Sequence, residues 1–209
     1  MVADLSSLDE VKQLANDANN AGPFDVVIHN AAVFKGDYKK TQDGLATTFA
    51  VNSLAPYVLT CLIKKPKRLV FLSSGMHFSG DASTSDLAWI KRGEKQWSYS
   101  RAYSDSKLHN VLLASAFARL WPGVASNSMD PGWVPTKMGG SGATGDIQAA
   151  VDTYVMLAEG NGGAAGVTGK YLANRKVTDP KAITDDIEAQ DRLLKAFEEI
   201  SGVSIPSDI

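Results

Sequence analysis

Hydrophobic residues recur at helical spacing in five stretches of the chain. The first follows Ser7, where Ser-Leu-Asp-Glu has the form of a capping box, and its apolar residues return every three or four positions until Gly22-Pro23. A longer stretch stops just before Pro122. The pattern predicts helices over residues 8–21, 54–63, 102–120, 147–157 and 187–200.

Four shorter runs between these helices have the character of strands. Residues 24–28 and 68–72 are continuously apolar and rich in β-branched side chains, which is typical of strands buried on both faces. Residues 124–129 and 169–172 follow as a third and a last strand. Strands that alternate with helices predict a parallel sheet with helices on both faces. Because neither a repeat nor a linker interrupts the pattern, we expect one α/β domain over residues 1–209.

Composition and charge exclude several classes of protein. With 209 residues, 44% hydrophobic and 21% charged, the chain is an ordinary globular one. Its net charge of −2 is spread over interspersed acids and bases, which argues against a nucleic-acid surface. Its N-terminus lacks an export pattern, and residues 54–63 are too few to span a bilayer. We therefore expect a cytoplasmic protein without a membrane or nucleic-acid partner.

Cysteine and histidine usage argues against a disulfide and against a metal site. The single cysteine, Cys61, cannot form an intrachain disulfide, and its apolar surroundings favour a buried thiol. The three histidines are far apart in the sequence and show no ligand spacing. A reducing compartment fits this pattern, and no metal is expected.

The clearest chemical motif lies in the first turns of the predicted helix over residues 102–120. Tyr103 and Lys107 form a Tyr-x-x-x-Lys pair, and positions four apart share one helix face. A nearby ammonium group lowers the pKa of a phenol from about 10, which makes a tyrosine usable for proton transfer. The motif also occurs by chance, so an exposed side-chain pair is the alternative interpretation of this motif alone.

Other polar segments follow the predicted strands in a consistent order. Residues 29–32, 73–75 and 130–136 each come directly after a strand, and Asn52 precedes the helix between the first two strands. The carboxyl ends of parallel strands meet at the edge where open α/β sheets bind ligands. We therefore expect these segments to meet the Tyr-x-x-x-Lys pair at one site.

Together, these segments resemble the short-chain dehydrogenase/reductase family. The family's patterns Asn-Asn-Ala-Gly, a helix Asn, Ser-Ser, Tyr-x-x-x-Lys and Pro-Gly-x-x-x-Thr are met in order between residues 29 and 136, with His29 and Ala32 as departures. The sequence around Asn52 and over residues 73–77 is closest to the branch that resembles retinol dehydrogenases and polyketide ketoreductases. The resemblance implies a Rossmann-like, doubly wound sheet.

The resemblance also implies a reaction and a role for each motif residue. Tyr103 would exchange a proton with the oxygen of a small-molecule alcohol or carbonyl while hydride moves to or from a nicotinamide. Lys107 would lower the pKa of Tyr103 and hold the ribose hydroxyls, Ser74 would bond the reacting oxygen, and Asn52 would hold a water. Taken singly, Ser74 could instead cap a turn, and Asn52 could satisfy backbone groups at a helix kink.

By the same resemblance, the cofactor is NADP or NAD. Asp4 and Leu5 would lie beside the adenine, and Val134 and Thr136 would face the nicotinamide amide. Residues that complete the expected cofactor trough, alongside the catalytic pair, are Asn30, Ala31, Ala32, Pro131 and Gly132. We further expect Trp89, Trp97 and Trp133 to shape an apolar pocket or its lid, with packing in the core or loops as the alternative.

Family members normally begin with a strand, a Gly-rich turn, a helix and a second strand, whereas Asp4 of this chain already matches the end of the third strand. We therefore expect a truncated sheet whose strand at residues 24–28 has an unpaired edge. Such an edge invites pairing with another chain. The expectation is a homodimer built on that edge, or an N-terminus rearranged to cover it.

Two glycine-rich segments could be taken for the absent phosphate turn. Residues 140–145 satisfy G-x-G-x-x-G, but no strand leads into them, so we interpret them as the family's substrate loop. Residues 160–163 are interpreted as a helix C-cap and a loop. Three hypotheses follow: an NAD(P)-dependent oxidoreductase, a non-redox binding or acid–base protein on the same scaffold, and a fragment of a longer, ordinary enzyme.

Overall fold

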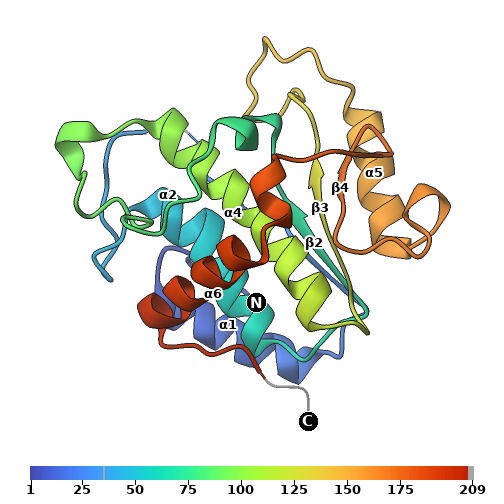
Figure 1. The fold of residues 1–209 in the computed structure, drawn as a ribbon, viewed down its shortest axis with the longest axis horizontal. Coiled ribbons are helices and arrows are strands. Elements are labelled where there is room, and N and C mark those ends of the chain that lie inside the picture. Colours follow the sequence, from blue (N-terminus) through green and yellow to red (C-terminus); the bar gives the residue numbers. More distant parts are fainter. Residues whose placement is uncertain (35, 207–209) are drawn as a thin grey trace.

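The computed structural model describes residues 1–34 and 36–206, which form a five-stranded sheet between two layers of helices (Figure 1). The strands run in the order β1-β2-β3-β4-β5; the first four are parallel, and β5 pairs antiparallel with β4. Their bounds are β1 Val26–His29, β2 Arg68–Leu72, β3 Ala125–Asp130, β4 Tyr171–Ala173 and β5 Lys176–Thr178. The prediction of a doubly wound α/β sheet is confirmed, with β1 to β4 parallel as expected and the antiparallel β5 not predicted.

The helices begin and end close to the positions that the periodicity predicted. They are α1 Leu8–Ala21, α2 Thr47–Phe49, α3 Ala55–Leu62, α4 Tyr99–Leu120, α5 Ile147–Glu159 and α6 Ile187–Ser201. A π-helical turn, Ala50–Leu54, joins α2 to α3, and short 3-10 turns cover Gly75–Ser79, Glu94–Gln96, Gly162–Ala164 and Ala182–Asp185. The capping box was half right. Ser7 Oγ accepts the Glu10 backbone N–H, but the Glu10 carboxylate bonds the N–H of Asp4 rather than that of Ser7.

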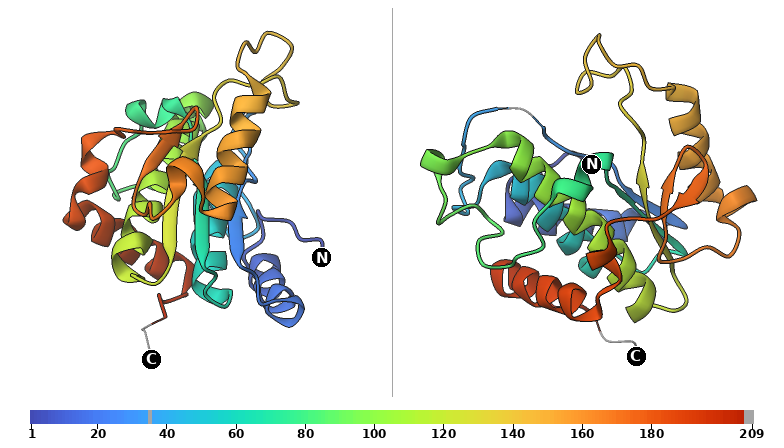
Figure 2. Two further views of the ribbon diagram at one scale, coloured as in Figure 1. Left: turned by 90° about the vertical axis from the view of Figure 1, so that its right-hand side faces the viewer. Right: turned by 45° about the horizontal axis from the view of Figure 1, so that its top comes forward.

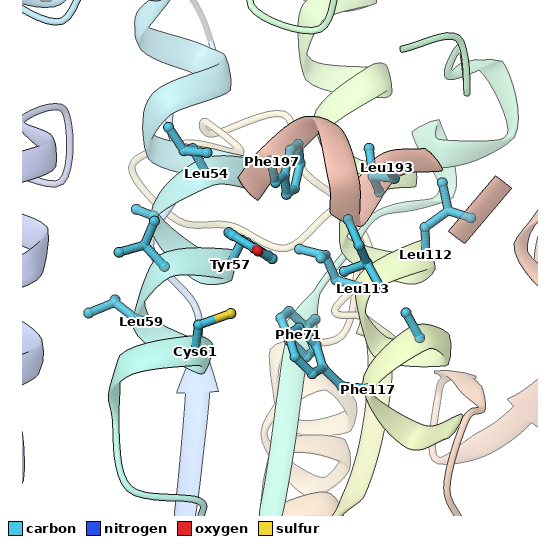
Figure 3. Close-up of a cluster of buried hydrophobic side chains, with 14 of the residues drawn as sticks. Leu54, Tyr57, Leu59, Cys61, Phe71, Leu112, Leu113, Phe117, Leu193 and Phe197 are labelled. Carbon is cyan, nitrogen blue, oxygen red and sulfur yellow. The ribbon is translucent and has the colours of Figure 1, made fainter. Parts of the chain in front are cut away.

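One face of the sheet carries most of the core. Helices α1, α3, α4 and α6 pack together on this face against β1 and β2. Figure 3 shows Phe197 of α6 above Tyr57 of α3, with ring centroids 5.3 Å apart, while Phe71 of β2 stacks beside Phe117 of α4. Because α6 closes this cluster, the C-terminal helix is part of the core that supports β2 and α4.

The other face is covered mainly by α5, which Figure 2 shows apart from the other helices. Val70 and Leu72 of β2 point to this face, whereas Leu69 and Phe71 point to the opposite one, so β2 is buried on both faces as predicted. The α5 helix covers β2, β3 and β4. It ends at Gly160 in the left-handed conformation, which confirms the predicted C-cap.

Strand β1 is the edge of the sheet in the described part of the chain. Among the described residues its only strand partner is β2, and Ile28 remains 37% exposed. The N-terminal residues do not pair with it: Val2 is fully exposed, and the chain end extends away from the sheet in Figure 2. The alternative of a rearranged N-terminus covering this edge is therefore wrong for the described residues.

Candidate active site

A cavity of about 1150 Å³ opens where the parallel strands end, and the segments that follow β1, β2 and β3 line it together with α4 and α5. Pockets for small ligands usually measure about 300–1,000 Å³, so this cavity is large enough for two ligand moieties side by side. The three polar segments that follow the strands therefore meet at the carboxyl ends of the strands, as predicted.

Helix α4 holds the Tyr-x-x-x-Lys pair against this cavity. Ser98 starts the helix by accepting the N–H of Arg101, so Tyr103 and Lys107 lie in its first turns. Both side chains line the cavity although they are only 8% and 3% exposed. The Lys107 ammonium lies 5.1 Å from the centroid of the Tyr103 ring and donates a 2.9 Å hydrogen bond to the carbonyl of Leu72. The pair is therefore buried and ordered, not an exposed surface pair.

Burial shifts the pKa of both groups, and the shift of Tyr103 is opposite to the one predicted. Desolvation, helped by the carboxylate of Asp130, raises the pKa of Tyr103 to about 12, and the hydrogen bond with Ser74 opposes this rise. Burial also lowers the pKa of Lys107 to about 8, while Asp130 acts in the other direction. The expected lowering of the Tyr103 pKa is thus corrected, because the loss of hydration of the phenolate outweighs nearby favourable interactions.

Ser74 lies beside the phenol because β2 and α4 are joined at this point. The preceding residue, Ser73, donates from Oγ to the carbonyl of Lys107 over 2.9 Å, which fixes the strand end to the helix. Ser74 then starts the 3-10 turn and accepts the N–H of Met76. The Ser74 side chain lies near enough to the Tyr103 phenol to oppose the rise of its pKa. Ser74, Tyr103 and Lys107 therefore share one cavity.

Asn52 does not line the cavity. It lies in the π-helical turn Ala50–Leu54, is fully buried, and uses its amide on protein groups. Its Oδ1 accepts the Val33 N–H at 2.8 Å, while Nδ2 donates to the Val33 carbonyl and to Ser106 Oγ. The structure therefore gives Asn52 a backbone-tethering role at a helix irregularity, and the water-holding role stays a prediction.

Most of the expected cofactor residues line the cavity, and two do not. The lining includes Asn30, Ala31, Ala32, Pro131, Gly132, Val134 and Thr136. Asp4 is exposed, and its carboxylate accepts the N–H of Ser6, while Leu5 packs at the start of α1 beside Leu45. Asp4 and Leu5 thus serve local packing in the structure, and their contact with an adenine stays a prediction.

Helix α5 contributes a wall that the motif search missed. Ile147, Val151 and Tyr154 line the cavity at positions i, i+4 and i+7, and the Tyr154 hydroxyl donates to Asn30 Oδ1 at 2.6 Å. The helical periodicity of this segment was visible in the sequence, but which face would meet the site depends on how α5 packs over β2 and β3.

Three further residues surround the phenol. The ring of Phe34 lies 4.5 Å from that of Tyr103, and the Tyr103 hydroxyl points to Met138 Sδ at 3.9 Å. Asp130 lines the same cavity, where its Oδ1 accepts the N–H of Gly132. Phe34 and Met138 come from loops, so no local pattern could have indicated them.

The expectation that three tryptophans shape the pocket is met by one of them. Trp133 lines the cavity, as expected, but Trp89 and Trp97 pack against each other in a separate cluster with Ala102. His77 is fully buried and does not line the cavity. His109 is also buried, and its Nδ1 lies 3.0 Å from Ser53 Oγ.

Other expectations concern metals, membranes and the glycine-rich loop. Residues 1–34 and 36–206 hold no group of three or more His, Cys, Asp or Glu side chains that could bind a metal. No helix in these ranges is both long and apolar enough to cross a bilayer. The loop between β3 and α5 rises above the sheet at the top of Figure 1, and its Lys137, Met138 and Gly139 line the cavity.

No protein-family model matches the chain. Among curated proteins, the chain is 42% identical over 208 residues to the short-chain dehydrogenase chyC of Penicillium rubens, and the match covers 99% of this chain and 80% of that protein. The chain belongs to the short-chain dehydrogenase/reductase family. Human retinol dehydrogenase 13 is 29% identical over 98% of this chain and 69% of its own length, in agreement with the retinol-dehydrogenase-like branch.

A solved structure agrees on the fold of this short-chain dehydrogenase/reductase. The crystal structure of the 3-alpha-hydroxysteroid dehydrogenase from Pseudomonas sp. B-0831 complexed with NADH has a TM-score of 0.61 and 20% sequence identity, and it covers 83% of this chain and 78% of that one. The predicted family and enzyme class, an oxidoreductase of short-chain dehydrogenase type, are confirmed.

Proposed function

We propose that this short-chain dehydrogenase/reductase transfers hydride between NAD(P)(H) and a ketone or secondary alcohol of moderate size. The observation that carries the proposal is that Ser74, Tyr103 and Lys107 line one cavity. The segments at residues 30–32 and 131–136, which the family resemblance assigns to the cofactor, line the same cavity. An acid, a hydrogen-bond donor and a cation therefore converge beside the expected nicotinamide position.

The side chains divide the work at the reacting oxygen. A bound nicotinamide would supply or accept the hydride at its C4 atom. Tyr103 gives its phenolic proton to the carbonyl oxygen in reduction, and Ser74 donates a hydrogen bond to the same oxygen. Lys107 holds ribose hydroxyls and places a positive charge near the phenol. A charge that develops on oxygen in a water-poor site is stabilised strongly by such fixed groups.

The raised pKa of Tyr103 keeps the phenol protonated over a wide range of pH. Because its pKa is about 12, the phenol is protonated near neutral pH and ready to donate a proton. Carbonyl reduction needs the protonated phenol, whereas alcohol oxidation needs the phenolate. The free enzyme therefore holds the protonated phenol that reduction requires.

The donor set fits the nicotinamide half of a dinucleotide. Lys107 Nζ supplies a cation, Thr136 supplies a hydroxyl, and the cavity has room for a ring beside a substrate. We propose NADP or NAD as the dinucleotide, a small-molecule carbonyl or alcohol as the partner, and the cytoplasm as the compartment. The single cysteine, Cys61, is buried and free, in accord with reducing surroundings.

The proposal is tested by following nicotinamide absorbance with a panel of ketones and either NADPH or NADH. Tyr103→Phe removes the acid and is expected to lower kcat by about 10²- to 10⁴-fold, the usual contribution of general acid catalysis. Tyr99→Phe, on the same helix but 44% exposed, is the matched control and is expected to leave kcat unchanged. Equal loss in both variants, or none in Tyr103→Phe, would contradict the assignment.

A second candidate is a non-redox protein that uses the same cavity for acid–base chemistry or for binding. It is favoured by the convergence of Tyr103, Lys107 and Ser74 in one cavity, because these groups can serve acid–base chemistry without a dinucleotide. Turnover of a substrate that depends on Tyr103 and needs no dinucleotide would support this candidate over hydride transfer.

A further inference from the structure

His77 lies inside the turn that presents Ser74, and both of its ring nitrogens are bonded to the backbone. Nδ1 lies 2.8 Å from the carbonyl oxygen of Ser74, and Nε2 lies 3.1 Å from the backbone nitrogen of Lys181. A carbonyl only accepts and a backbone N–H only donates. The imidazole is therefore neutral, with its proton on Nδ1 donated to Ser74 and a lone pair on Nε2 receiving the N–H of Lys181.

The surroundings of the ring hold it in this orientation. His77 is fully buried, and its ring lies 4.7 Å from that of Tyr171 and 4.1 Å from that of Phe78. Burial lowers the pKa of His77, which keeps the ring neutral, while Asp130 and Lys181 act in opposite directions. Both hydrogen bonds are thus made by one fixed tautomer in a desolvated site, where losing a partner is costly.

A second set of contacts clamps the far end of the same turn. Lys181 Nζ donates to the carbonyl of Gly80 at 2.6 Å, and the N–H of Asp81 is donated to Asp105 Oδ1 at 2.9 Å. Gly80 packs so closely on α4 that an added Cβ would lie 2.5 Å from the carbonyl oxygen of Ser104, the residue after Tyr103. The turn is therefore held in a fixed position against α4 and against the segment before α6.

We propose that His77 is a positioning residue that sets the place of the Ser74 hydroxyl relative to Tyr103 through its bond to the Ser74 carbonyl. In this role it also ties the Ser74 turn, through Lys181, to the C-terminal segment that leads into α6. The inference rests on the proposed function, because the task it gives His77 is to position the Ser74 hydroxyl for that reaction. It predicts that the two hydrogen bonds of one ring have separable effects.

Two substitutions separate these effects. In His77→Asn, the side-chain amide nitrogen can occupy the place of Nδ1 and keep the bond to Ser74, but the acceptor for Lys181 is lost. In His77→Gln, the longer side chain can place an acceptor near Nε2, but the donor to Ser74 is lost. His109→Asn is the control, because His109 is equally buried and likewise bonds a serine, but this serine, Ser53, does not line the cavity as Ser74 does.

The experiment measures kcat, KM and unfolding for these variants, together with nitrogen-15 NMR of the His77 ring in the full chain. We expect His77→Gln to lower kcat by up to about 10²-fold with KM for the cofactor unchanged, as small displacements of reacting groups do. His77→Asn should retain most of kcat, although it loses stability like His109→Asn. Equal kcat in His77→Asn and His77→Gln, once both are folded, would overturn the positioning role.

The NMR measurement separates this inference from the proposed function. An Nδ1-protonated ring and slow hydrogen exchange at the Lys181 amide are expected in the wild-type chain, whether or not it turns over a ketone. An Nε2-protonated or charged ring near neutral pH would overturn the inference. Absence of turnover in a wild-type chain with the expected tautomer would instead reject the proposed function.

Discussion

Asp130 is the charged side chain that couples to both members of the catalytic pair. Its carboxylate raises the pKa of Tyr103 and also acts to raise that of Lys107, because an anion disfavours a phenolate and favours an ammonium. Sequence motifs name the tyrosine and the lysine, but this third group decides at which pH each changes its charge.

Asp130→Asn should therefore lower the pKa of both Tyr103 and Lys107. Alcohol oxidation requires the Tyr103 phenolate, so the rise of its kcat/KM with pH should begin at lower pH in the variant than in the wild type. Carbonyl reduction, which needs the protonated phenol, should weaken at a correspondingly lower pH. The pH–rate profiles in both directions measure this. Asp25→Asn is the control, because Asp25 is exposed just before β1, at the end of the sheet away from the cavity. An unchanged oxidation limb would contradict the coupling.

Among individual residues, the sequence predicted the site positions of those whose motif spacing is local. Tyr103 and Lys107 are four positions apart on one helix, and Ser74 directly follows a strand, so motif order was enough to bring them to one site. The direction of the Tyr103 pKa shift was missed because it depends on burial, which the motif does not contain. Phe34 and Met138 were missed because loop paths follow from tertiary packing.

Among the elements, the starts of α5 and α6 were predicted at the residues where they lie, because capping is a local interaction, whereas α4 begins before its predicted start at residue 102. Asp146 and Asp186 each accept two backbone N–H groups at the start of α5 and α6. Strand β5 was missed because its three exposed residues show no apolar pattern. Its turn carries positive φ angles at Asn174 and Arg175, as a type I′ hairpin turn requires, but the second is not the glycine that usually marks such a turn.

The two helix caps give a prediction at the scale of the element. Asp146→Ala and Asp186→Ala should each lower the free energy of unfolding by about 1 kcal/mol, since each removes an N-cap. Of these two helices, α5 lines the cavity and α6 does not, so Asp146→Ala alone should raise KM for the nicotinamide cofactor. Chemical unfolding and steady-state kinetics check both parts. A similar rise in KM for Asp186→Ala would show that the effect is not specific to α5.

In the whole molecule, the two edges of the sheet differ. The β5 edge is a short antiparallel hairpin, whereas β1 ends a parallel sheet with Ile28 and Phe24 partly exposed. An exposed, apolar edge strand is a template for pairing with another chain. We therefore retain the prediction of a homodimer built on β1.

Ile28→Lys should shift this equilibrium towards the monomer, because a charge on an apolar edge opposes pairing. Val177→Lys places the same charge on β5, where 47% of Val177 is exposed, and should leave the mass unchanged. Size-exclusion chromatography with light scattering gives the mass of each form. A well-behaved wild-type monomer with fast hydrogen exchange across residues 24–28 would rule out the β1 dimer.

Calorimetric titration of the purified chain with NADPH and with NADH tests the central claim most directly. The account predicts saturable binding of at least one dinucleotide, retained in Tyr103→Phe, which keeps the cavity, and weakened in Lys107→Met, which loses the cation that would hold the ribose. Absence of binding of both dinucleotides at millimolar concentration, in a chain shown to be folded, would contradict hydride transfer at this site.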